Sequence, residues 1–234
     1  MISIAIDGPS GAGKSSIARR VAARLGYIYV DTGALYRAIG LFAHRNNIDD
    51  TDEAALAPRL GDIRVELAHQ DGKQHIILNG EDVSEEIRKP EMSMAASNVS
   101  ALPAVRAFLL DLQRQMARNY NVIMDGRDIG TVVLPQANVK IFLTATAEDR
   151  AMRRHKEFLK RGETISYHEV LADINRRDYN DTHRDIAPLR PAEDAILLDT
   201  TGNTLEQSVA LVEQTIREQL CAMPGSGRGS SSKP

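Results

Sequence analysis

The N-terminal segment GPSGAGKSS contains the residue types best suited to chemistry in this chain. It has the spacing GxxxxGKS, follows the apolar run 2–6 and precedes a helix-like stretch from Ser16 to Leu25, which is the strand–loop–helix context of a phosphate-binding loop. Glycines let the backbone curl with its N–H groups directed inward, and the following helix dipole adds attraction for anions. The spacing predicts a polyphosphate site made by Gly8, Pro9, Ser10, Gly11, Ala12, Gly13, Lys14, Ser15 and Ser16.

Two further features indicate a magnesium ion beside that polyphosphate. Lys14 can reach the outer phosphates, and the hydroxyl of Ser15 is placed to bind a Mg²⁺ ion that bridges them. The segment 122–125 has the pattern of a strand that ends in an acid, Asp125, which is typical of the second magnesium-associated element in nucleotide-binding folds. We expect Ser15 and Asp125 to hold the ion, the latter through water.

Basic residues recur where strand-end loops are expected. Arg37 follows the strand 27–30, the Arg127–Asp128 pair follows the strand 122–125, and the stretch 176–184 is the most polar of the chain. A helix beginning near Thr146 places three guanidinium groups on one face, which predicts either a flap over phosphates or a solvated surface. These guanidinium groups are carried by Arg150, Arg153 and Arg154.

The distribution of arginines favours a small-molecule kinase over an ATPase, a GTPase switch or a nucleotide-gated binder. Planar guanidinium forks suit a second phosphate group beyond the one that the loop binds. The guanine-reading sequence Asn-Lys-x-Asp is absent. The arginines outside the phosphate loop are Arg37, Arg106, Arg127, Arg177 and Arg184. Arg106 lies off the apolar face of its helix, and by helical spacing alone we expect it to be solvated.

The elements that must position these side chains alternate between strands and helices. Apolar and charged residues alternate over 63–67, and a second strand-like run follows at 75–78. Turn signals stand at Asp71-Gly72 and Asn79-Gly80. This pattern predicts a small antiparallel insert in an α/β chain. Parallel strands are expected at 2–6, 27–30, 122–125, 139–143 and 195–198. The closing helix 204–220 has an apolar stripe formed by Leu205, Val209, Val212 and Ile216.

Composition predicts one compact protein in the cytoplasm. The 234 residues carry a net charge of −3, which argues against a nucleic acid polymer or a membrane surface as partner. A lone cysteine, Cys221, fits a reducing compartment, and no apolar run approaches the ~20 residues needed to span a bilayer. We expect a monomer with a single folded unit at 1–221. The Pro-, Gly- and Ser-rich tail 222–234 is predicted to be disordered.

The sequence also resembles the bacterial cytidylate kinase family. The similarity runs from the first strand to the last helix and includes GPSGAGKSS, DTGALYRA, AASNVSALPAVR and, most specifically, DGRDIGTVVLP with RRDYNDTHRDIAPL. It implies a P-loop NTPase fold of the adenylate kinase type: a five-stranded parallel sheet flanked by helices, an acceptor-binding insert at about 33–105 and a helical lid at about 150–184. The implied reaction uses ATP and Mg²⁺ to phosphorylate CMP and dCMP.

The resemblance implies roles for individual residues. Ser97, Arg106 and Asp128 would face the cytosine ring. Arg37, Arg127 and Arg184 would clamp the acceptor phosphate, with Thr32 nearby where family members often have serine. Arg177 and Asp181 would reach the sugar, and Arg154 the ATP phosphates. The catalytic group would comprise Lys14, Arg127, Arg154 and Arg184. Two alternatives stay open: another kinase of this fold acting on UMP, AMP or a hydroxyl acceptor, and a nucleotide-dependent switch or binding module.

Overall fold

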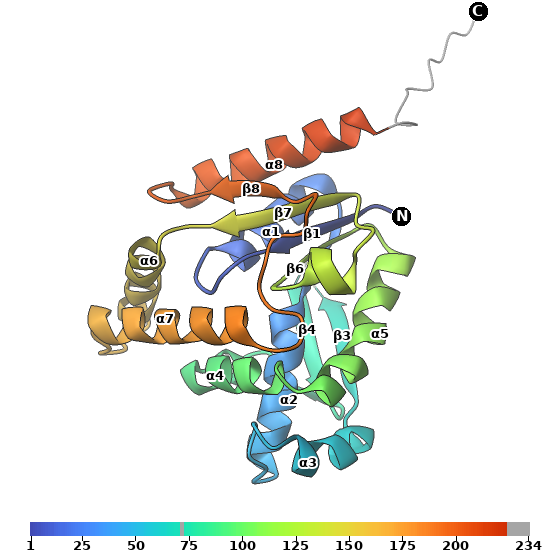
Figure 1. Cartoon of the computed structure of the whole chain (residues 1–234), viewed down its shortest axis with the longest axis vertical. Helices are drawn as coiled ribbons and strands as arrows, with labels where there is room; N and C mark the ends of the chain where they lie inside the picture. The colour runs from blue at the N-terminus through green and yellow to red at the C-terminus, as the bar shows by residue number, and fades with distance from the viewer. Residues whose placement is uncertain (71–72, 224–234) are drawn as a thin grey trace, which may run out of the picture.

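A five-stranded parallel sheet forms the centre of the computed structural model, which describes residues 1–70 and 73–223 (Figure 1). The strand order is β2-β6-β1-β7-β8, with β1 in the middle. Every residue of β6 is buried, as expected for a parallel strand covered on both faces. The strands are β1 (Ser3–Asp7), β2 (Ile28–Asp31), β6 (Val122–Gly126), β7 (Val139–Thr144) and β8 (Ile196–Asp199). The predicted five-stranded parallel sheet is confirmed.

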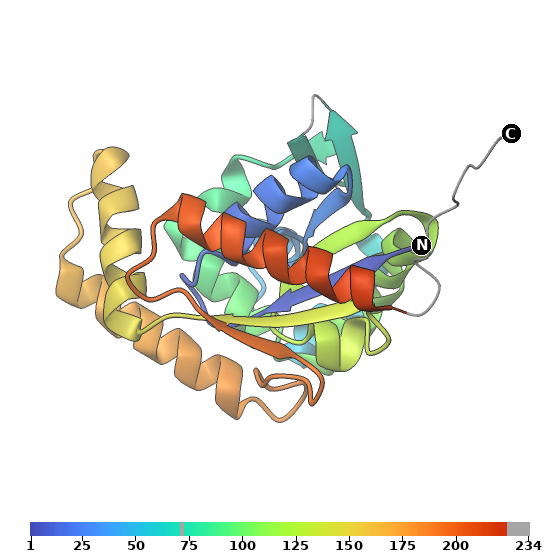
Figure 2. The same cartoon turned by 90° about the horizontal axis from the view of Figure 1, so that it is seen from above.

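Helices cover both faces of this sheet. One face packs against α1 (Lys14–Leu25) and α8 (Leu205–Ala222), whose ribbon crosses the sheet in Figure 2. The opposite face packs against α5 (Pro103–Asn119) and the short π-helical turn η3 (Ile129–Val133). The predicted stripe of α8 is wrong at one position: Leu205 is 37% exposed because it is the first residue of the helix, whereas Val209, Val212 and Ile216 are fully buried.

A small antiparallel sheet is inserted between the core elements, as predicted. Its strands are β3 (Val65–Gln70), β4 (Lys73–Leu78) and β5 (Glu81–Asp82). The predicted turn at 71–72 lies outside the described residues, and the turn at Asn79 and Gly80 has positive φ angles at both positions. The side chain of Gln74 accepts the backbone N–H of Asp31 at 3.0 Å, so the insert is joined to the end of β2.

The insert shares a core with the helices around it. This apolar cluster includes side chains from β3, β4, α2, α4 and α5. The helical elements that enclose it are α2 (Thr32–Arg45), α3 (Glu53–Leu56), the 3₁₀ turns η1 (Ala57–Asp62) and η2 (Glu86–Arg88), and α4 (Pro90–Val99). Pro90 and Pro103 lie in the first turns of α4 and α5, where the missing N–H costs nothing.

Two helices project from the carboxyl edge of the sheet (Figure 1) and are called the lid helices below: α6 (Ala147–Lys160) and α7 (Tyr167–His183). Thr146 and Ser166 cap their first turns through side-chain oxygens. A separate small core, built on Ala151, Phe158, Val170 and Ile174, holds the two helices together. In the part of the chain that the structure describes, no helix is long and apolar enough to cross a membrane. The predicted tail lies outside these residues from position 224 onward.

Asp7 at the end of β1 fixes the turn that follows β6. Its carboxylate accepts the backbone N–H groups of Ile129 at 2.8 Å and Gly130 at 2.7 Å, and burial raises its pKa from 3.8 to about 6. Between these two pH values the folded state keeps a proton that the unfolded chain has lost, so stability falls as the pH rises from about 4 to about 6.

We expect Asp7→Asn to remove this pH dependence of stability, because an amide does not titrate in this range. The raised pKa corresponds to roughly 3 kcal/mol of pH-dependent stability at about 1.4 kcal/mol per unit. Urea unfolding of wild type and variant from pH 4 to 7 measures it: the variant should gain about that amount relative to wild type over this range. A constant difference between the two proteins would show that Asp7 is ionised throughout.

Candidate active site

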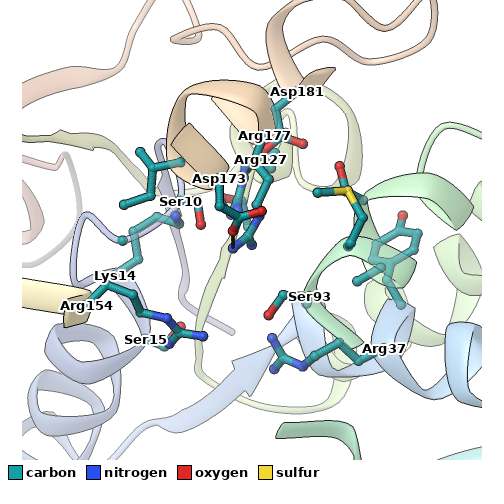
Figure 3. Close-up of a pocket in the computed structure, with 18 of the residues that line it drawn as sticks. Ser10, Lys14, Ser15, Arg37, Ser93, Arg127, Arg154, Asp173, Arg177 and Asp181 are labelled. Atoms are coloured by element: carbon teal, nitrogen blue, oxygen red, sulfur yellow. Dashed lines mark hydrogen bonds and ion pairs between the residues drawn. The ribbon is translucent and has the colours of Figure 1, made fainter. Parts of the chain in front are cut away.

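A cavity of about 520 Å³ opens at the carboxyl edge of the sheet, where strand-end loops of parallel sheets bind their ligands (Figure 3). The phosphate loop, the start of α2, α4, the end of β6 and the lid helices all contribute to its wall. Gly8, Pro9, Ala12 and Arg106 do not reach this wall. The predicted site residues that do are Ser10, Gly11, Gly13, Lys14, Ser15, Ser16, Thr32, Arg37, Ser97, Asp125, Arg127, Asp128, Arg154, Arg177, Asp181 and Arg184.

The phosphate loop has the backbone shape that its glycines predict. Gly8 has a φ of +147°, and a Cβ at this position would lie 2.0 Å from the carbonyl oxygen of Leu143. Gly13 has a φ of +85° and precedes the first turn of α1. Any side chain at Gly8 would therefore displace β7, so the close approach of loop and strand requires glycine.

Lys14 is buried in this loop, where Arg127 and the carboxylates of Asp7, Asp125 and Asp181 act on its charge. Its Nζ donates to the carbonyl oxygens of Gly8 at 2.7 Å and Pro9 at 2.8 Å. Burial first, and the nearby Arg127 second, lower the pKa of Lys14 to about 7. A lysine and an arginine held together beside the positive end of a helix dipole fit a bound polyphosphate, whose negative charge would attract both.

Asp125 lies across from Ser15 and offers the oxygen ligands that Mg²⁺ prefers. The hydroxyl of Ser15 donates to Asp125 Oδ2 at 2.9 Å, and the hydroxyl of Tyr29 donates to Asp125 Oδ1 at 2.9 Å. Burial and the neighbouring Asp31 raise the pKa of Asp125 to about 6. A hydroxyl and a carboxylate beside a phosphate cradle fit magnesium, which keeps several waters and takes few protein ligands.

Three guanidinium groups come to the cavity from different parts of the chain. Arg37 on α2 pairs with Asp31 at 3.0 Å, and Arg127 after β6 pairs with Asp181 at 2.6 Å. Arg184, which follows α7, pairs with Asp128 at 3.3 Å. Thr32 is held close by through a bond from its hydroxyl to the carbonyl oxygen of Asp125 at 2.7 Å. Figure 3 shows Arg37 on the opposite side of the pocket from Lys14, with Arg127 between them.

Arg106 is buried, not solvated as its helical position predicts. Only 8% of it is exposed, and its guanidinium forms an ion pair with Asp128. It also lies over the ring of Tyr36, 6.0 Å from the centroid. The buried residues of α5 are Val105, Arg106, Leu109 and Gln113, so the buried face of this helix, which packs against α2, extends to Arg106. In this structure Arg106 contacts Asp128 instead of lining the cavity.

The lid helices bring mixed charges to the other end of the cavity. Arg154 lies over the ring of Phe158 at 4.7 Å, and burial, followed by the nearby Arg127, lowers the pKa of Arg177 to about 10. The prediction that Arg150 belongs with Arg153 and Arg154 to a solvated face or to a flap over phosphates is wrong. That side chain is only 5% exposed. Its guanidinium donates hydrogen bonds to Asp178 on α7 and to two backbone carbonyl oxygens.

Sequence reasoning missed several residues of the cavity wall. Asp31 caps α2 by accepting the N–H of Ala34 at 2.9 Å while it pairs with Arg37. An aspartate three positions before the capped amide was a readable signal for a helix start. Tyr36 was recognisable only as an apolar helix residue. The other missed wall residues include Ser93, Ser100 and Asp173.

These features define a P-loop kinase fold: the strand order of the sheet, the phosphate loop, and the part of the cavity lined by Arg37, Arg127 and Arg184. The family model for cytidylate kinase matches residues 4–218. A cytidylate kinase from Caldicellulosiruptor bescii is 51% identical over 206 residues, covering 88% of this chain and 91% of that protein. One from Carboxydothermus hydrogenoformans is 51% identical over 213 residues, covering 91% and 96%. The chain belongs to the cytidylate kinase family.

A solved structure shares the fold at low sequence similarity. An uncharacterized protein from Eubacterium ventriosum is 10% identical, has a TM-score of 0.51, and covers 93% of this chain and 98% of its own. At this identity the likeness concerns the fold alone.

Proposed function

We propose that the chain transfers the terminal phosphoryl group of ATP to CMP and dCMP, giving ADP and the nucleoside diphosphate. One observation carries this proposal: Arg37, Arg127 and Arg184 face the same cavity as Lys14. A hydrolase needs no second cationic site of this kind, whereas a kinase must hold two polyanions with their phosphates aligned. Membership in the cytidylate kinase family supports cytosine as the base of the acceptor.

We assign the donor side of the cavity to ATP. The backbone N–H groups of loop residues that line the cavity, such as Gly11 and Gly13, would bind its phosphate oxygens. Lys14 would neutralise the outer phosphates, and Arg154 would reach them from the lid. Mg²⁺, held by Ser15 and through water by Asp125, would offset the charge that develops between the phosphates. The region at about 150–184 would serve as the lid, and that at about 33–105 as the acceptor-binding part.

The acceptor side explains why no catalytic base is needed. The second pKa of a phosphate monoester is near ~6, so the attacking oxygen of CMP is largely deprotonated at neutral pH. The arginine side chains would orient this phosphate and offset its charge, and closure of the lid would exclude water. Arg177 and Asp181 would contact the sugar, while Ser97 and Asp128 would face the base.

A panel of acceptors tests the proposed function directly. ADP release is measured with ATP, Mg²⁺ and one of CMP, dCMP, UMP, AMP or shikimate, the last as a hydroxyl acceptor. We expect turnover with CMP and dCMP to exceed that with each other acceptor by at least ~10²-fold. Equal or higher turnover with UMP, AMP or shikimate would reassign the acceptor, and absence of transfer to any free acceptor would favour a switch or binding module.

Loss of the Asp125 carboxylate should raise the requirement for magnesium. In Asp125→Asn the neutral amide can still accept from Ser15, but it attracts the cation and its waters less strongly. We expect the Mg²⁺ concentration for half-maximal rate to rise by about 10-fold, and calorimetry to show correspondingly weaker Mg²⁺ binding to the enzyme–ADP complex. Asp111→Asn, a helix-surface carboxylate on α5, is the matched control. Unchanged Mg²⁺ dependence would remove Asp125 from the metal site.

A further inference from the structure

Arg150 joins three segments of the molecule at the base of the lid helices. Its Nε donates to the carbonyl oxygen of Ala145 at 2.9 Å, and its Nη1 donates to that of Ser10 at 2.8 Å. Its Nη2 donates to Asp178 Oδ2 at 2.6 Å. The partners lie before α6, in the phosphate loop and on α7. One buried guanidinium therefore connects the loop that is proposed to hold ATP with both helices of the lid.

We propose that Arg150 is a positioning residue for the phosphate loop and acts through the peptide between Ser10 and Gly11. This peptide is trans and planar, so the Ser10 carbonyl and the Gly11 N–H point in opposite directions. Because Arg150 holds the carbonyl, the Gly11 N–H is directed away from the Arg150 guanidinium, and Gly11 lines the cavity. Backbone amides in such loops bind phosphate oxygens. The inference rests on the proposed use of ATP.

Direct packing between α6 and the loop supports this role. Gly11 has a φ of +75°, and a Cβ at this position would lie only 3.2 Å from Cβ of Arg150. The loop backbone therefore has little room to move independently of the start of α6. A shift of Arg150 would be transmitted to the Ser10–Gly11 peptide without any intermediate side chain.

The geometry also explains why this position needs arginine. A guanidinium presents five N–H donors in a fixed plane, and here three of its nitrogens reach three acceptors in different directions. The ammonium group of lysine is a single point and cannot keep all three bonds from the same backbone position. Arg150→Lys should therefore preserve the positive charge for Asp178 but loosen the loop.

One variant of Arg150, one variant of its partner Asp178 and one control variant test the proposal. Calorimetry measures binding of Mg²⁺–ATP and, separately, of CMP, and deuterium exchange follows the peptide that covers residues 8–13. We expect Arg150→Lys to weaken ATP binding by about 10-fold, to leave CMP binding within about twofold, and to speed exchange in the loop. Asp178→Asn, which retains the shape of the side chain, should show a smaller change in the same direction.

Arg114 provides the matched control because it too holds backbone carbonyls. It donates to those of Val132 and Val133, both at 3.0 Å, and does not contact the phosphate loop. Arg114→Lys should lower thermal stability without changing ATP affinity or loop exchange. If Arg150→Lys behaves in the same way, Arg150 is only structural and the proposal is overturned. If wild type fails to bind ATP, the proposed function fails, and loop exchange in Arg150→Lys still decides the role of Arg150.

Discussion

Arg184→Ala is expected to lower kcat for CMP phosphorylation by about 10³-fold while changing ATP affinity by less than about threefold. Arg184 is far from the donor loop in sequence, comes to the cavity after α7, and is 6% exposed at its side chain. An arginine that neutralises charge only during transfer contributes to the transition state and little to the ground state. Steady-state kinetics gives kcat, and calorimetry gives the ATP affinity.

Structural damage must be separated from this effect, because Arg184 also donates to the carbonyl oxygen of Ala187 at 2.7 Å. Arg184→Lys keeps the charge and should recover about 10-fold of the lost kcat, whereas a purely structural role predicts no recovery from charge alone. Arg190→Ala removes one exposed arginine nearby and should leave kcat within about twofold. Turnover of Arg184→Ala near the wild-type rate would contradict the assignment of Arg184 to catalysis.

Local sequence signals predicted the phosphate-loop side of the cavity well. The strand β1, the phosphate loop and α1 are consecutive in the chain, so the spacing of glycines and the helix start are enough to define them. The same holds for the insert, where alternation predicted the antiparallel strands β3 and β4, and the turn signal at Asn79 and Gly80 marked the end of β4. The positions of the five strands along the chain could also be predicted from local patterns. The family resemblance was needed to predict that they form one parallel sheet.

Charged side chains at helix surfaces were predicted less well. Arg106 and Arg150 both look solvated or ligand-facing by helical spacing, yet each is buried against an aspartate more than 20 residues away in the chain. Burial of an arginine depends on a partner that offsets its desolvation, and that partner is known only once the helices are packed. Roles that depend on one residue holding another were therefore visible only in the structure.

The acceptor base is expected to be read by Asp128, whose carboxylate is already engaged by two arginines. Arg106 bonds to Oδ2 and Arg184 to Oδ1. A carboxylate has about four lone-pair sites, so it can still accept a hydrogen bond from the exocyclic amine of cytosine. Uracil presents a carbonyl oxygen at the same place, which a carboxylate repels. The two guanidinium groups hold the carboxylate in place, and toward the base it can act only as a hydrogen-bond acceptor.

Asp128→Asn should therefore narrow the preference for CMP over UMP by about 10²-fold, because an amide can turn its NH₂ group toward the uracil carbonyl. Both rates will also fall through loss of the ion pairs with Arg106 and Arg184, so the informative quantity is the ratio of kcat/KM for CMP to that for UMP. Asp181→Asn is the control: it removes a carboxylate proposed to contact the sugar, which CMP and UMP share, and should lower both values with little change in their ratio. A ratio in Asp128→Asn equal to that of wild type would mean that Asp128 only neutralises its two arginines and that the base is recognised elsewhere in the cavity.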